Sequence, residues 1–527
     1  MARRYFGTDG VRGVAGVDLT ADLVERLGRA ATAWAGGGDV LVGRDTRGSG
    51  PELEEALARG IASAGGTALL AGVLPTPAVA LLADDLGAVV SASHNPPEYN
   101  GVKLFREGAK LTDDEEEAIE ALLDAPGQGG GSSRHVPDAA DRYLAHVLES
   151  FGSDLTGLRI GVDCANGAFF ELAPRAFREL GAEVHAIGVE PDGSNVNVGC
   201  GATDLVALSR EVRDAECHLG VAFDGDGDRM LAVDERGEAV DGDQILAVLA
   251  LALGVDLVAV TVMTNLGFHR LMAEHGITVV TTPVGDRYLL GALREYEGQL
   301  GGEQSGHLVW LGSHVTGDGL AAALLLCRAL GGRRASEAFA VLQRFPQAKR
   351  NVTVSSRELP PHLLDEVDRI GAELGDGGRV LVRPSGTEPV VRVLVEAENA
   401  EDAERICGSL AALVERELGC ARRRAPPGSF VFGDSIDASH RDSGREADAF
   451  RDLRATGNRA RGRRSCAPDG GSLRCAESSD TSDLASASRC SCRGSSGSST
   501  AATTRPGSPC SRATGSTMCG RSARSRT

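Results

Sequence analysis

The chain has 527 residues, a formal net charge of −19, 42% hydrophobic residues and only 4% aromatic residues. This length predicts three or four domains rather than one. The acidic balance excludes a general nucleic-acid binder, which needs a broad basic face. With 69 Gly and few aromatic residues, the cores must be built from Ala, Val and Leu.

The start of the chain, MARRYFGTDG, lacks the apolar stretch of a secretory signal. The longest uncharged apolar run, 245–255, is shorter than the roughly 20 residues that span a bilayer, and we expect it to form a buried core helix. The six cysteines up to Cys420 show no CxxC spacing, as expected of reduced thiols. We therefore expect a cytoplasmic protein with no membrane or nucleic-acid partner.

Short apolar strands alternate with amphipathic helices through residues 1–420. The first ones expected are strands at 40–42, 68–70 and 88–90, with helices at 51–64 and 78–83 between them. Continuous apolar strands of this kind favour α/β layers with both sheet faces covered. The Gly-rich segment 126–133 is predicted to be a surface loop, and a helix is expected at about 138–149.

Three further units follow, starting near residues 158, 244 and 351. In the last unit we expect strands at 351–355, 379–383 and 390–396, and helices at 362–373 and 400–417.

After about residue 421 the pattern is lost. Residues 421–527 contain 19 Arg, no Lys and 10 acidic residues, a net charge of +9, which leaves −28 for residues 1–420. This tail also contains clusters rich in Ser, and such clusters bury too little apolar area to offset the loss of chain entropy on folding. We interpret the tail as a disordered or non-native extension, such as an out-of-frame translation, in preference to a functional basic arm.

The segment Asp224-Gly-Asp-Gly-Asp228-Arg229 follows an expected strand at 219–222. Three carboxylates at alternate positions repel one another unless a cation neutralises them, and hard oxygen ligands select Mg²⁺ or Ca²⁺. An EF-hand loop is the main rival, since Glu235 falls at its twelfth position. However, Arg229 stands where that loop needs Gly, and 230–233 reads as a returning strand.

Three other polar loops are candidates for chemistry. Ser93 and His94 follow a strand, with Lys103 nearby, and a serine there can be a nucleophile or a phosphoryl carrier, although Ser, His, Asn and Pro also form ordinary turns. The segment 302–307, GEQSGH, offers side chains that match sugar hydroxyls and amines. The segment 383–389, RPSGTEP, and Arg392 suit a phosphate, and Arg12 could join that positive patch.

Taken together and in this order, SASHNP, DGDGDR, GEQSGH and RPSGTEP resemble the α-D-phosphohexomutase superfamily over about 420 residues. Within it, FGTDGVRG, TPVGDRYLL and Gln304 are similar to the bacterial phosphoglucosamine mutase branch.

The resemblance implies three similar mixed α/β domains and a smaller α+β C-terminal domain around a central cleft. The expected boundaries are 1–150 with the serine loop, 151–243 with the metal loop, 244–347 with the sugar loop, 348–420 with the phosphate loop, and the extension 421–527.

The resemblance also implies the roles of the site residues. Ser93 would be a phosphoserine and, with Asp224, Asp226 and Asp228, would bind one Mg²⁺, with Arg229 beside the metal. The sugar would contact Glu303, Gln304 and Ser305, and the phosphate that does not react would contact Arg383, Ser385, Gly386, Thr387 and Arg392. The reacting oxygen would be surrounded by Arg12, His94, Lys103 and His307.

The implied reaction interconverts glucosamine 6-phosphate and glucosamine 1-phosphate, with glucosamine 1,6-bisphosphate or glucose 1,6-bisphosphate as intermediate or activator. A homodimer is expected by resemblance alone. The alternatives are a phosphomannomutase or phosphoglucomutase with the same loops, a metal-dependent phosphomonoesterase, and a Ca²⁺-binding protein without turnover.

Overall fold

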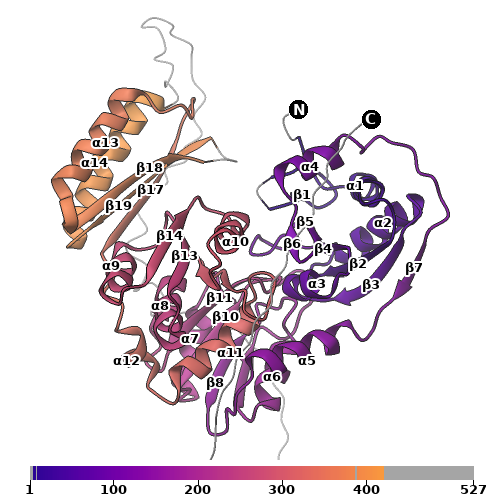
Figure 1. The fold of residues 1–527 in the computed structure, drawn as a ribbon, viewed down its shortest axis with the longest axis horizontal. Helices are drawn as coiled ribbons and strands as arrows, with labels where there is room; N and C mark the ends of the chain where they lie inside the picture. Colours follow the sequence, from indigo (N-terminus) through magenta and orange to yellow (C-terminus); the bar gives the residue numbers. More distant parts are fainter. Residues whose placement is uncertain (1–3, 8, 386–388, 420–527) are drawn as a thin grey trace, which may run out of the picture. The chain divides into compact units, whose positions relative to one another are not determined.

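The computed structural model describes residues 4–7, 9–385 and 389–419. The interpretation of residues 421–527 therefore lies outside the described residues. Four separate sheets, each with its own helices, make up the described part of the chain (Figure 1). They match the expected three mixed α/β domains and a smaller C-terminal α+β domain, and the exact domain boundaries stay predictions.

The first sheet has the strand order β1-β5-β4-β2-β3-β7, with β6 paired to β5. Parallel pairs (β2 with β3 and β4) and antiparallel pairs (β5 with β4 and β1) occur together, so the sheet is mixed. Its elements are β1 (Val11–Val14), α1 (Ala21–Ala35), β2 (Asp39–Arg44), α2 (Gly50–Ser63), β3 (Thr67–Val73), α3 (Thr76–Leu82), β4 (Leu86–Val90), β5 (Tyr99–Arg106), β6 (Ala109–Lys110), α4 (Asp113–Glu120) and β7 (Ser132–His135).

Strand β7 corrects one expectation. The Gly-rich segment 126–133 was predicted to be a loop throughout, but its last residues begin β7, which pairs parallel with β3. All four residues of β7 are exposed, so the strand carries no apolar pattern that could reveal it.

Helix α5 (Ala139–Phe151) leads into the second sheet, which has the order β12-β11-β10-β8-β9. Its elements are β8 (Arg159–Asp163), α6 (Leu172–Glu179), β9 (Glu183–Ile187), α7 (Val206–Asp214), β10 (Leu219–Phe223), β11 (Met230–Asp234) and β12 (Ala239–Val240). Strand β10 is buried along its whole length, which explains its uninterrupted apolar sequence.

The third sheet has the order β14-β13-β15-β16. Its elements are α8 (Gly242–Leu253), β13 (Leu257–Thr261), α9 (Leu266–Glu274), β14 (Thr278–Thr282), α10 (Asp286–Glu295), β15 (Leu300–Gly302), β16 (Leu308–Trp310), α11 (Gly319–Leu330) and α12 (Ala335–Phe339). Helix α8 is buried from Ile245 to Ala250, as expected for a core helix, and it packs against the equally apolar α11.

The fourth sheet, β17-β19-β18, is covered on one face by α13 and α14 (Figure 1). Its elements are β17 (Gln347–Thr353), α13 (Pro361–Leu374), the short 3-10 helix η1 (Gly375–Gly377), β18 (Gly378–Pro384), β19 (Val390–Ala397) and α14 (Ala400–Leu418). Buried residues of α14 recur every three or four positions, at Ala403, Cys407, Leu410 and Val414, which is the helical period predicted for 400–417. This domain has its own apolar core.

Two further sequence expectations can be examined in the described residues. None of the five described cysteines forms a disulfide, and all of them are buried. Each helix within the described ranges is too short or too polar to cross a bilayer.

Helices α1 and α2 pack closely because Gly60 has no side chain. A Cβ at Gly60 would lie 2.0 Å from the carbonyl oxygen of Glu25 on α1, which no side chain tolerates. We predict that Gly60→Ala destabilises the protein by about 1–3 kcal/mol, since overpacking of a close contact costs that much. Urea unfolding followed by circular dichroism measures it.

Gly408→Ala is the matched control, because Gly408 is also helical but its Cβ would meet no atom within 4 Å. This control should be neutral or slightly stabilising. Equal destabilisation by both substitutions would contradict the proposed close packing of α1 and α2.

Candidate functional site

The serine loop holds Ser93 in an unusual backbone conformation. Ser93 follows β4, is fully buried and has φ of 54°, in the left-handed region that serine rarely adopts. Its amide donates to Ser91 Oγ at 2.9 Å, and its carbonyl oxygen accepts from Arg47 Nη2 at 2.8 Å and from Asn197 Nδ2 at 2.9 Å. Several fixed contacts thus determine a strained backbone, a pattern that is common at functional sites.

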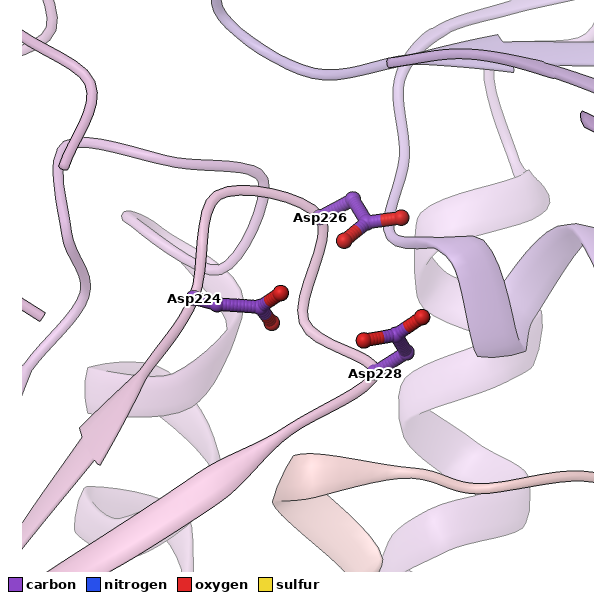
Figure 2. Close-up of side chains that lie close together, drawn as sticks. All are labelled: Asp224, Asp226 and Asp228. Atoms are coloured by element: carbon purple, nitrogen blue, oxygen red, sulfur yellow. The ribbon is translucent and has the colours of Figure 1, made fainter. Parts of the chain in front are cut away.

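The metal loop joins β10 to β11, which pair antiparallel. This hairpin excludes the EF-hand alternative, which requires a helix on each side of the loop. The three buried carboxylates of Asp224, Asp226 and Asp228 converge, each with an oxygen within 4.8 Å of the others (Figure 2). Gly227 permits the curl, with φ of 79° and no room for a Cβ beside Phe169.

The serine loop and the metal loop meet directly. Ser93 Oγ donates a hydrogen bond of 2.5 Å to Asp224 Oδ2. From the same domain as Ser93, Thr76 Oγ1 donates to Asp226 Oδ2 at 2.5 Å, and Lys103 Nζ donates to Asp226 and Asp228 at 2.7 and 3.1 Å. The residues predicted to form a nucleophile and a metal site are therefore in contact.

The buried charges of this loop shift one another's pKa in opposite directions. Burial and the charges of Asp228 and Asp226 raise the pKa of Asp224 well above its usual range. Burial also disfavours ionised Asp228, but Lys103, His307 and Arg229 outweigh it and hold the pKa of Asp228 well below its usual range. Burial thus disfavours ionised Asp224, whereas the neighbouring cations favour ionised Asp228.

The donor set fits a hard divalent cation. The Oδ1 atoms of Asp226 and Asp228 are buried without a hydrogen-bond donor among the described residues. Buried carboxylate oxygens without partners are costly, and a bound cation removes that cost. Oxygen-only ligands select Mg²⁺ or Ca²⁺ over softer metals.

Basic side chains lie beside the two loops. Arg12 is largely buried and forms an ion pair with Asp9, and burial lowers the pKa of Arg12. Burial lowers the pKa of Arg229 as well, but Asp228 and Asp224 outweigh it and raise that pKa overall.

His94 lies next to the serine, with Nδ1 3.4 Å from Ser93 Oγ. Burial, followed by the charges of Arg229 and Arg12, lowers the pKa of His94 to about 4. The imidazole is therefore neutral near pH 7 and able to accept a proton.

The sugar loop packs against the metal loop, since the amide of Met230 donates to the carbonyl of Gly306 at 2.9 Å. Ser305 Oγ donates to Glu303 Oε2 at 3.0 Å, and Glu303 Oε1 accepts from the amide of Gly285 at 3.2 Å. His307 is buried on the same loop.

The side chain of Gln304 makes its contacts outside the sugar loop. Its Oε1 accepts from Lys349 Nζ at 2.6 Å, and its Nε2 lies 3.3 Å from Asp241 Oδ2 and 3.4 Å from Gln347 Oε1. The structure thus separates Gln304 from Glu303 and Ser305 and directs it to the start of α8 and to β17.

The phosphate loop brings two arginines together. Arg383 on β18 and Arg392 on β19 are directly opposite cross-strand partners. Burial and the charge of Arg392 lower the pKa of Arg383, as expected for like charges side by side. An anion between two guanidinium groups relieves that repulsion. Ser385 follows Arg383 and its amide donates to Val390 O at 2.9 Å. Gly386 and Thr387 lie outside the described residues.

Sequence reasoning missed several residues of this site. Thr76 contacts Asp226, and Arg47 and Asn197 determine the Ser93 backbone. A second group contains Asp9, Lys110 and Asp286, which form buried ion pairs near Lys103. Asp9 and Asp286 lie within FGTDGVRG and TPVGDRYLL, so a signal existed for these two residues.

Comparison with family models covers most of the described chain. Models described as phosphoglucomutase/phosphomannomutase α/β/α domains I, II and III match residues 3–129, 141–237 and 241–345. The model of the C-terminal domain matches residues 336–413.

Individual proteins are similar over the same region. A phosphoglucosamine mutase of Saccharopolyspora erythraea is 49% identical, over 78% of this chain and 99% of that protein. The crystal structure of a phosphoglucomutase/phosphomannomutase family protein from Burkholderia thailandensis is 27% identical with a TM-score of 0.69, over 79% of this chain and 99% of that one.

A more distant structure shares the fold. It is that of Aspergillus fumigatus N-acetylphosphoglucosamine mutase in complex with GlcNAc-6P and magnesium, with 19% identity and a TM-score of 0.55, over 78% of this chain and 96% of that one. The predicted resemblance is thus confirmed by four domain models in the expected order and by close full-length relatives. The chain belongs to the phosphoglucomutase/phosphomannomutase family and is a phosphohexomutase, an isomerase that moves phosphate within a sugar.

Proposed function

We propose that this phosphohexomutase interconverts glucosamine 6-phosphate and glucosamine 1-phosphate, and that Ser93 carries the phosphoryl group. The observation that carries the proposal is the contact between Ser93 Oγ and Asp224 in the buried carboxylate loop. The similarity to a phosphoglucosamine mutase over nearly its whole length supports the choice of an amino sugar.

The proposed reaction has two transfers. Phosphorylated Ser93 gives its phosphoryl group to O1 of glucosamine 6-phosphate, which breaks the Oγ–P bond and yields the 1,6-bisphosphate. The sugar then turns, and Ser93 Oγ takes the phosphoryl group from O6, which releases glucosamine 1-phosphate. Charge spreads over the phosphoryl oxygens in each transition state, so fixed positive groups supply most of the stabilisation.

Two groups of residues would stabilise the charge on the phosphoryl oxygens. Asp224, Asp226 and Asp228 would hold Mg²⁺, which when bound supplies positive charge to the phosphoryl oxygens. Arg12, Lys103 and Arg229 would add fixed positive charge at the same place, supported by their burial around the carboxylates.

Proton movement needs a base that is neutral at the working pH. The sugar hydroxyl that is phosphorylated must lose a proton, and neutral His94 would accept it, with His307 as the second candidate. Burial and the charges of Arg229 and Arg12 disfavour protonated His94. Protonation of His94 should therefore not reduce activity at pH 5.

The phosphate that does not react and the sugar hydroxyls would bind at the two remaining loops. Arg383 and Arg392 would bind the phosphate with Ser385, Gly386 and Thr387, and either phosphate of the bisphosphate could occupy that place. Glu303 and Ser305 would bind sugar hydroxyls. Glucose 1,6-bisphosphate or glucosamine 1,6-bisphosphate would donate the phosphoryl group that phosphorylates Ser93.

The metal proposal predicts a thermal response to Mg²⁺. At 100 times its dissociation constant, a ligand of the folded state adds about 2.7 kcal/mol of stability. Addition of Mg²⁺ to chelator-treated protein should therefore raise Tm by several degrees, measured by differential scanning calorimetry. Asp226→Asn should abolish the rise, and Asp84→Asn, at an exposed carboxylate outside the loop, should retain it. A wild-type Tm indifferent to Mg²⁺ would count against the site.

The carrier role of Ser93 predicts that Ser93→Ala lowers kcat by about 10³-fold or more while the unfolding temperature changes little, because the transfer loses its acceptor. Intact-protein mass spectrometry should detect one phosphate on wild type, removable by phosphatase, and none on the variant. Ser133→Ala, at an exposed serine of β7, should behave as wild type. Full turnover by Ser93→Ala would remove this residue from the mechanism.

The choice of sugar is tested by kcat/KM on glucosamine 6-phosphate, glucose 6-phosphate and mannose 6-phosphate. We expect the highest value for the amino sugar and no release of inorganic phosphate at the rate of isomerisation. A preference for glucose or mannose 6-phosphate would replace the proposed substrate, and rapid phosphate release would indicate a phosphomonoesterase.

A further inference from the structure

A buried carboxylate that the mechanism above does not use lies between two of the domains. Asp286 is the first residue of α10 and is 9% exposed. Its Oδ2 lies 2.6 Å from Lys110 Nζ, on β6 of the serine-bearing domain, and 3.9 Å from His307 Nε2, on the sugar loop. One oxygen therefore faces a basic side chain from each of two domains.

Lys110 extends this contact toward the serine and metal loops. Its Nζ also forms an ion pair with Asp9, whose other oxygen lies 3.6 Å from Lys103 Nζ and pairs with Arg12. Lys103 in turn contacts Asp226 and Asp228. Charges of alternating sign thus run from Asp286 through Lys110, Asp9 and Lys103 to the metal loop, and His307 lies beside Asp286.

The ring of His307 is confined from the other side by backbone. A Cβ at Gly317 would lie 2.3 Å from both Cε1 and Nε2 of the ring, so the imidazole packs directly on this glycine. Nε2 has no hydrogen-bond partner among the residues that the structure describes. With one face of the ring fixed by Gly317, the carboxylate of Asp286 lies 3.9 Å from this buried nitrogen.

Asp286 stays ionised in this buried place. Burial would raise its pKa, but Lys110 and His307 outweigh that effect and lower the pKa of Asp286 to about 2. A neighbouring contact between the same two domains joins Arg287 to buried Glu116 and to half-exposed Asp113. Asp286 differs from both acidic partners because it lies beside His307.

We propose that Asp286 is a positioning residue whose carboxylate binds Lys110 and faces His307, so that the two domains bring the proton carrier and the serine loop together. The inference rests on the proposed function, because it assumes that His307 acts on the reacting oxygen. It assigns no contact between Asp286 and the sugar.

Asp286→Asn keeps the volume of the side chain and removes its charge, and Asp286→Glu keeps the charge. We expect Asp286→Asn to lower kcat between about 10- and 100-fold, because a small misplacement of a catalytic group costs that much, with little change in KM. Asp286→Glu should recover part of the loss. Asp113→Asn, which removes an acidic partner from the same domain contact, should keep kcat within twofold, roughly the error of such a comparison.

Three kinetic results would overturn the inference. The first is a wild-type kcat in Asp286→Asn, and the second is a kcat of Asp286→Asn at least equal to that of Asp286→Glu. The third is an equal loss in Asp113→Asn, which would reduce Asp286 to a general domain contact.

Thermal unfolding gives a readout that does not need turnover. Asp286→Asn and Lys110→Met should each lower Tm, and the double variant should lower it by less than the sum, since both remove the same ion pair. Additive losses would contradict the pairing. If wild type itself isomerised no hexose phosphate, the proposed function would be wrong. The Tm values of the two single variants and the double variant would still test the contact between Asp286 and Lys110.

Discussion

Three carboxylates buried within one loop are the constraint around which the described chain is organised. Asp224, Asp226 and Asp228 repel one another and have lost most of their hydration, so each must be neutralised by protonation, by a cation or by a hydrogen bond. The first domain supplies hydrogen bonds from Thr76 and Ser93 and a positive charge from Lys103. The need to compensate these charges is therefore also what brings the serine to the place where phosphate chemistry is proposed.

The same constraint explains why several basic residues of an acidic protein lie together here. Residues 1–420 carry a net charge of −28, yet Arg12, Lys103, Lys110 and Arg229 all lie near this loop. A substrate with one or two phosphate groups would be repelled by most of the surface and attracted here and at the pair Arg383 and Arg392. Specific binding of a phosphosugar then follows from where these cations lie rather than from the net charge of the chain.

Much of this could be predicted from the sequence, because the chemistry stands in short contiguous loops after apolar strands. The strand before Asp224 and the return strand from Met230 were predicted from their residues, and the hairpin between them was found. Helix 400–417 was predicted from its period and matches α14 within one residue. Gln304 was expected near the sugar by resemblance, and its contact with the sugar stays a prediction, while its Oε1 accepts a hydrogen bond from Lys349. Thr76 and Lys110 were missed because their partners lie on other elements, 100 or more residues away, and no local pattern records such pairs. Asp9 and Asp286 lie within FGTDGVRG and TPVGDRYLL, but the sequence alone indicates no partner for them.

The carbonyl of Ser93 accepts one hydrogen bond from Arg47 of its own domain and another from Asn197 of the next. The left-handed backbone conformation of Ser93 therefore depends on two domains. Its hydrogen bonds are complete only when the segments that carry Arg47 and Asn197 have folded and come into contact. A fragment ending before Asn197 would keep the serine but lack one of the bonds that fix its backbone. Co-expressed halves divided between the first two sheets would thus have to reassociate before the nucleophile acquired its geometry.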